Sequence, residues 1–132
     1  MLVDTYVGAG LIPFVDPEDA YASMRHVAFA PSLNLVAGTL LGRITATGKY
    51  AAYNNALATG VETAVPLITQ YRVITDASGN VTSLGIVPMP SAPCFTQGYF
   101  RCEDVVGEDA PGFVDIGATI VTGNITTGLF KF

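Results

Sequence analysis

The chain has 132 residues, of which 13% are charged, and a net charge of −5. Soluble domains typically contain about 25% charged residues, so burial in an oligomer or a larger assembly is the simplest explanation of the composition. The acidic balance and the six dispersed Lys and Arg residues argue against nucleic acid as a partner. A small and unusually apolar β-domain that functions alone is the alternative.

No segment is predicted to span a membrane. The longest uncharged run, residues 77–100, is broken by glycines and prolines and cannot form an apolar helix of about 20 residues. No basic residue precedes Arg25, so the N-terminus does not resemble a signal peptide, and synthesis in the cytoplasm is expected. There, Cys94 and Cys102 are expected to be reduced thiols that serve as packing groups.

The first segment, Met1 to Phe14, is predicted to be an extended arm. It shows neither helical periodicity nor a strong turn, which is typical of a segment that orders on a partner. An ordinary edge strand of the domain is the alternative. The candidate anchors on the arm are its apolar side chains: Leu2, Val3, Tyr6, Val7, Leu11, Ile12 and Phe14.

A short helix is predicted from Asp16 to Arg25. Asp16 suits the N-cap, Pro17 suits the first helical position, and Asp19 stands where a capping-box acid would. The chain is therefore expected to divide into an arm with a possible short helix, residues 1–25, and a β-rich domain, residues 26–132.

The β-rich domain is predicted from its many Thr, Val and Ile residues and its closely spaced turn signals. Residues 76–80 form a strong hairpin loop, and Thr47-Gly48 marks a second tight turn. Residues 54–60 are a polar connection with one helical turn at most. The predicted strands are His26–Ala30, Thr39–Ala46, Lys49–Tyr53, Leu67–Thr75, Val81–Val87, Phe95–Arg101, Thr119–Val121 and Ile125–Phe132.

Few residues are candidates for catalysis or cofactor binding. His26 lacks the second histidine or cysteine pair of a zinc site and is interpreted as a strand-boundary residue. Neither cysteine has a partner base that would suggest a nucleophile. No glycine-rich loop precedes a helix with a lysine, so nucleotide binding has no support. We expect no catalytic residue, no metal and no cofactor.

A cluster of acids follows Cys102. Its spacing does not fit an EF-hand loop, and Gly107, Pro111 and Gly112 indicate a solvated turn, so a bound divalent cation is the less favoured interpretation. The first two acids can also begin a short helix after Arg101. The cluster comprises Glu103, Asp104, Glu108, Asp109 and Asp115.

Two stretches carry a family resemblance. Residues 35–50, LVAGTLLGRITATGKY, resemble the AGT-hydrophobic-LG-x-I-T-x-x-G-K-Y strands of lambda-type phage head-decoration proteins, and residues 98–106, GYFRCEDVV, resemble their G-x-F-R-x-E-D-V segment. The two stand in the family's order, although Cys102 replaces an aromatic residue and residues 16–25 and 54–65 have no obvious counterpart. The matching residues are Ala37, Gly38, Thr39, Gly42, Ile44, Thr45, Gly48, Gly98, Phe100, Arg101, Glu103, Asp104 and Val105.

The resemblance implies a fold and a function. The fold would be a mostly β, β-clip-like (β-tulip-like) domain with one or two short helices and an extended N-terminal arm. The protein would be a non-enzymatic homotrimer on the outer surface of the virion. Its arms would order against the major capsid protein by strand addition and stabilise the expanded head against packaged-DNA pressure.

Two other classes of function compete with this one. A β-module for host-surface or carbohydrate recognition could use the six tyrosines and seven phenylalanines as a sugar platform, although the chain has no tryptophan. A small trimeric hydrolase of similar architecture would need an acidic active-site motif and a base–nucleophile pair, and neither is evident.

Overall fold

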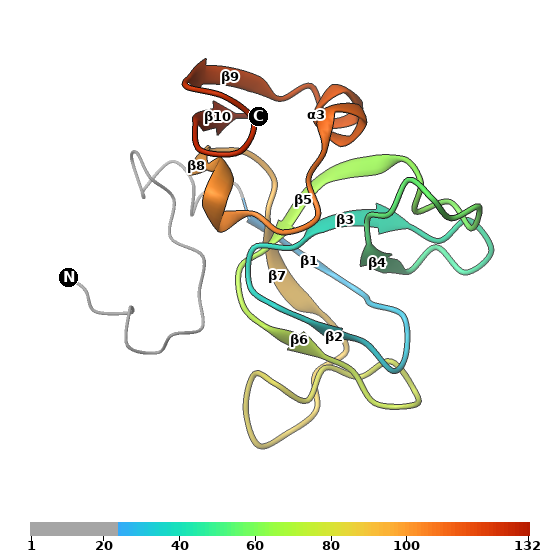
Figure 1. Ribbon diagram of the computed structural model, residues 1–132. Helices are drawn as coiled ribbons and strands as arrows, with labels where there is room; N and C mark the ends of the chain where they lie inside the picture. The colour runs from blue at the N-terminus through green and yellow to red at the C-terminus, as the bar shows by residue number, and fades with distance from the viewer. Residues whose placement is uncertain (1–23) are drawn as a thin grey trace.

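The computed structural model describes residues 24–132, which form a mostly β domain with several sheets and short helices, as the sequence predicted (Figure 1). The seven arm residues singled out above and most of the predicted helix from Asp16 to Arg25 lie outside the described residues. Met24 and Arg25, at the end of that predicted helix, belong instead to the first strand. The elements are β1 Met24–Val27, β2 Asn34–Leu35, β3 Leu40–Arg43, β4 Tyr50–Ala52, β5 Ala64–Thr69, β6 Val73–Ile74, β7 Ala92–Phe95, β8 Tyr99–Arg101, η1 Cys102–Asp104, α3 Ala110–Ile116, β9 Thr119–Thr122 and β10 Leu129–Lys131.

A central sheet of five antiparallel strands, in the order β1-β7-β5-β3-β4, organises the domain. A three-stranded sheet, β8-β10-β9, lies with α3 at one end of the molecule, and the two-stranded sheet β2-β6 lies toward the other (Figure 1). The register between β3 and β5 shifts between Leu40 and Leu41, as at a β-bulge.

Both faces of the central sheet are buried. Successive side chains on a strand point to opposite faces, so Leu40 and Leu41 of β3 enter two different hydrophobic clusters, and Leu67 and Ile68 of β5 divide in the same way. A sheet with two buried faces needs nearly continuous apolar strands. Part of the apolar composition therefore follows from the fold itself, without a partner.

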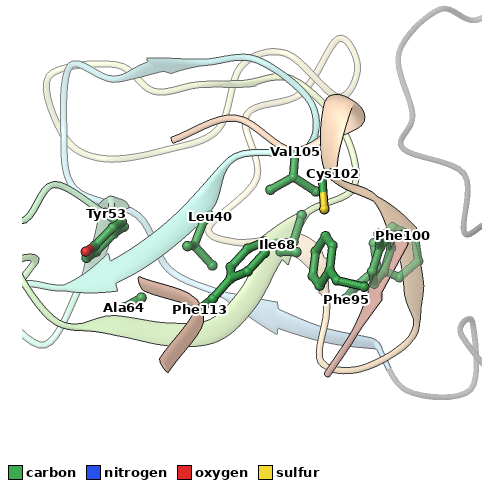
Figure 2. Close-up of a cluster of buried hydrophobic side chains, with 10 residues drawn as sticks. Leu40, Tyr53, Ala64, Ile68, Phe95, Phe100, Cys102, Val105 and Phe113 are labelled. Atoms are coloured by element: carbon green, nitrogen blue, oxygen red, sulfur yellow. The ribbon is translucent and has the colours of Figure 1, made fainter. Parts of the chain in front are cut away.

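The first cluster, here called the aromatic core, lies between the central sheet and the C-terminal elements. Its rings pack at close range: the centroid of Phe100 is 5.3 Å from that of Phe95 and 5.8 Å from that of Phe130, and Phe113 is 4.7 Å from Phe130. Figure 2 shows side chains of this cluster from β3, β5, β7, β8 and α3, among them Leu40, Ile68, Phe95, Phe100 and Phe113. Its buried members are Leu40, Tyr53, Ala64, Ile68, Phe95, Phe100, Cys102, Val105, Phe113 and Phe130.

The second cluster, here called the aliphatic core, lies on the opposite face of the central sheet. It includes both strands of the small β2-β6 sheet and contains a single phenylalanine. Its buried members are Val27, Phe29, Leu35, Leu41, Leu67, Val73, Val81, Ala92 and Cys94.

The predicted turns are confirmed. At the loop of residues 76–80, the Asp76 carboxylate accepts hydrogen bonds from the backbone N–H groups of Ser78 and Asn80, both at 2.9 Å. Gly48 adopts a φ of +73° between β3 and β4, in the left-handed region that favours glycine. The short helix expected near Glu103 is the 3-10 helix η1. Residues 54–60 form turns without a helix.

Several predictions are wrong. The predicted strand Leu67–Thr75 covers the end of β5 and all of β6, which belong to different sheets because the chain bends at residues 70–71. The predicted strand Phe95–Arg101 likewise covers the end of β7 and all of β8, which are separated by a bend at residues 96–97. The predicted strand Ile125–Phe132 begins only at Leu129, after a turn. The predicted strand Val81–Val87 is a loop in which only Val81 pairs, through isolated bridges to Thr75 and Met89. The predicted solvated turn around Pro111 lies in helix α3. That helix forms because the Asp109 side chain accepts from the N–H of Gly112 as an N-cap, a proline occupies the first turn, and Gly117 ends the helix at a φ of +71°.

Candidate functional site

The two motif stretches lie side by side in the structure. Thr39 and Val106 form a parallel bridge. The N–H of Leu40 donates to the carbonyl of Val106 at 3.0 Å, and the N–H of Val106 donates to the carbonyl of Gly38 at 2.8 Å. The neighbours Leu40 and Val105 both enter the aromatic core. Segments far apart in the sequence therefore form one structural unit, called here the motif pair (residues 35–50 and 98–106).

Several motif residues have structural roles that explain why these residue types stand there. The buried Thr39 hydroxyl donates to the carbonyl of Val36 at 2.7 Å, and the N–H of Thr39 donates to the hydroxyl of Thr69 at 3.0 Å. A Cβ at Gly42 would stand 2.6 Å from the Cα of Val61, so only glycine fits there. The other motif residues that are buried or half-buried are Ala37, Gly38, Ile44, Gly48, Gly98, Phe100 and Val105.

Four motif residues are exposed. Thr45 follows β3, Arg101 ends β8, and Glu103 and Asp104 lie in η1. Thr45 adjoins the central sheet, whereas Arg101, Glu103 and Asp104 adjoin the three-stranded sheet; exposed polar positions beside rigid strands can take part in contacts with a partner. Arg101, Glu103 and Asp104 are three of the chain's few charged residues, and they are consecutive apart from Cys102.

A cavity of about 430 Å³ lies beside η1 and the start of α3. Burial raises the pKa of Glu108, and burial is also the main cause that raises the pKa of the Cys102 thiol. The thiol is therefore protonated at neutral pH and is a weak nucleophile. The residues that line the cavity are Cys102, Glu103, Val105, Glu108, Asp109, Ala110, Ile125 and Thr126.

Two acids of the predicted cluster serve the fold. Asp109 caps α3, and its carboxylate also accepts from the Tyr53 hydroxyl at 2.8 Å and from the Asn55 amide at 3.1 Å. The Asp115 carboxylate accepts from the N–H of Ala64 at 2.9 Å, which ties α3 to β5. Within residues 24–132, no group of three His, Cys, Asp or Glu side chains is placed to hold a metal ion.

The histidine and the cysteines are placed as follows. His26 lies inside β1, exposed, with its Nδ1 3.5 Å from the Ser91 hydroxyl. Cys94 and Cys102 are free and buried in opposite cores, which confirms their interpretation as packing thiols. Burial raises the pKa of Cys94 to about 12.

The sequence interpretation missed an exposed apolar segment. Ile86, Val87 and Met89 are exposed in the loop before β7, where a strand had been predicted to Val87. Gly85 and the prolines at 88 and 90 were the available signal for a loop.

The described aromatic side chains are all at least partly buried: every Phe and Tyr within residues 24–132 is buried or half-buried. Among the same residues, no helix has the length and apolar character to cross a bilayer.

Comparison with protein-family models, with curated protein sequences and with solved structures finds no match to this chain.

Proposed function

We propose that the chain is a capsid decoration, or cement, protein that binds the outer surface of the expanded phage head as a homotrimer and stabilises it against packaged-DNA pressure. The observation that carries the proposal is the motif pair. Two stretches that resemble one family, in that family's order, are hydrogen-bonded to each other and share a core. Chance likenesses at two unrelated positions would have no reason to meet in this way.

The work of such a protein is binding, not bond making. The arm, residues 1–14, would add a strand to a sheet edge of the major capsid protein, with its apolar side chains as anchors. Three arms on one trimer act together through effective concentration, so each contact can be modest. The protein would act on the virion surface after synthesis in the host cytoplasm, without a nucleic acid, membrane, metal or cofactor.

Supporting this proposal, the buried and exposed motif residues divide by role. The buried ones build the scaffold, as Thr39 and Gly42 do, while Arg101, Glu103 and Asp104 remain exposed at the surface.

The test is saturable binding to phage heads. The full chain is mixed with expanded heads stripped of their own decoration protein and with unexpanded heads, and the bound protein is measured after sedimentation. We expect saturable binding to the expanded heads and an increase in the temperature at which they release DNA. No binding to either form in a panel of heads would refute the proposal.

The arm is tested by deletion of residues 1–14. The truncated protein should keep the far-UV circular dichroism and the oligomeric state of the full chain but no longer hold expanded heads. Equal binding by the truncated and intact proteins would place attachment elsewhere on the molecule.

A further inference from the structure

The loop between β6 and β7 holds large apolar side chains in water. Ile86 is 101% exposed, Val87 is 68% exposed and Met89 is 41% exposed. Of the eight exposed large hydrophobic residues in the described part of the chain, three thus fall within four positions. We call Ile86, Val87 and Met89 the apolar tip. The loop projects at the end of the molecule away from the three-stranded sheet and α3 (Figure 1).

The base of this loop is fixed by hydrogen bonds. Val81 and Met89 exchange two of them, with N···O distances of 2.7 and 2.8 Å. The Ser83 hydroxyl donates to the carbonyl of Arg72 at 2.7 Å and accepts from the N–H of Ile74 at 3.0 Å. Prolines at 88 and 90 restrict the backbone further. The loop is therefore organised before it meets any partner, which lowers the entropy lost on binding.

The apolar tip does not fold back onto the domain, although one neighbour does. Leu84 packs against the aliphatic core, whereas Ile86 and Val87 point into solvent. An isolated exposed valine is ordinary, but several exposed apolar side chains within four positions of a loop with a fixed base are typical of an anchor that enters a pocket.

The charges around the apolar tip favour a protein pocket over a lipid surface. No charged residue occurs from residue 77 to residue 100, and the whole chain carries a net charge of −5. Arg72, near the base of the loop, already donates to Asn34 at 2.7 Å. Segments that insert into membranes usually pair their apolar residues with Lys or Arg that contact anionic headgroups. The loop has none.

The area of the apolar tip favours a repeated attachment over a simple dimer. Three such side chains bury on the order of 300 Å², whereas a stable interface buries about 800 Å² on each partner. The apolar tip cannot hold a dimer alone, but it can contribute where several contacts act together on one lattice. The cavity beside η1 does not fit it on a second copy, because Glu103, Glu108 and Asp109 line that cavity.

We propose that the apolar tip docks into an uncharged, apolar pocket of the major capsid protein and forms an attachment point separate from the arm. This inference rests on the proposed capsid-binding function and names the part of the folded domain that makes the contact.

The test introduces a charge at the apolar tip and, as a control, at a matched position elsewhere. Val87→Asp and Ile86→Asp change the apolar tip, and Val114→Asp makes the same substitution on α3, where Val114 is 79% exposed. All three variants should unfold near the wild-type temperature, because the altered side chains are exposed. Binding to stripped, expanded phage heads should weaken at least tenfold for the two apolar-tip variants and change less than twofold for Val114→Asp.

Each other outcome overturns the inference in a recognisable way. If wild type binds and Val87→Asp binds as well as Val114→Asp, the apolar tip is not an attachment point, while the proposed function stands. If wild type binds none of the heads in the panel, both the role of the apolar tip and the proposed function are refuted. If the Val87→Asp substitution changes the sedimentation of the free protein, the apolar tip contacts a second copy of this chain instead of the capsid protein. Flotation of wild type but not Val87→Asp with phosphatidylethanolamine–phosphatidylglycerol vesicles would make it a lipid surface.

Discussion

The two faces of the central sheet are built differently. The aromatic core holds four of the chain's seven phenylalanines, joins the sheet to the C-terminal elements, and contains residues of both motif stretches. The aliphatic core holds one phenylalanine, covers the small β2-β6 sheet, and supports the loop that carries the apolar tip. One face therefore holds the long-range connections of the fold together, while the other positions an exposed loop.

This comparison predicts that the aromatic core contributes more stability per residue. Phe100→Ala removes a fully buried ring that contacts Phe95 and Phe130, and should lower the free energy of unfolding by about 4 kcal/mol. Urea unfolding measures the loss. The matched control is Phe132→Ala, a half-buried ring 5.5 Å from Phe100, which should cost clearly less. Equal losses from the two variants would contradict the assigned role of Phe100.

The aliphatic core should tolerate truncation somewhat better. Leu41→Ala removes a fully buried side chain and should lower the free energy of unfolding by about 3 kcal/mol. Leu57→Ala, the same substitution at a residue that is 49% exposed, should change it by less than about 0.5 kcal/mol. If Leu41→Ala cost more than Phe100→Ala, the proposed ranking of the two cores would be reversed.

The two cores also show what the sequence could predict. The turn at Thr47-Gly48 separates the predicted strands that contain β3 and β4, because local turn chemistry and β-branched residues suffice there. The strand predicted from Val81 to Val87 failed because its apolar residues resemble a strand, while Gly85 and the following prolines prevent strand pairing.

Helix α3 was missed for a long-range reason. Gly112 lowers helix propensity, so the sequence around it favours a turn. In the structure a Cβ at that position would stand 2.8 Å from the Tyr53 ring, so glycine is needed for packing between segments far apart in the chain. The pairing of Thr39 with Val106 was beyond local sequence analysis for the same reason: the register of distant segments is set by tertiary packing.

Asp109 connects α3 to the rest of the aromatic core and gives the next prediction. Asp109→Ala removes an N-cap and the acceptor of the Tyr53 hydroxyl, so the free energy of unfolding should fall by about 2 kcal/mol. Asp104→Ala, at an exposed acid in η1, is the matched control and should have little effect. Comparable losses in the two variants would mean that the cap does not stabilise α3.

Each core also contains a group that titrates at alkaline pH. Burial raises the pKa of Cys94 in the aliphatic core to about 12. The pKa of Tyr53 in the aromatic core also rises to about 12, through burial first and then through its hydrogen bond to Asp109. A folded-state pKa above the unfolded value means that the folded protein holds its proton longer. Stability is then intact below the unfolded pKa and is lost as pH rises toward 12.

The unfolded values, about 8.5 for cysteine and about 10 for tyrosine, separate the two contributions. Wild-type stability should be flat near neutral pH and begin to fall near pH 9. Cys94→Ala should make the fall shallower between about pH 9 and pH 10, where Cys102 still titrates, and Tyr53→Phe should reduce the slope only above pH 10. The pKa of Cys102 is also raised, so its titration lowers the stability of wild type and of both variants in the same direction. This contribution cancels when each variant is compared with wild type. Urea unfolding from pH 7 to pH 11.5 measures the slopes, and a slope between pH 9 and pH 10 in Cys94→Ala identical to that of wild type would show that the thiol is not shielded by the aliphatic core.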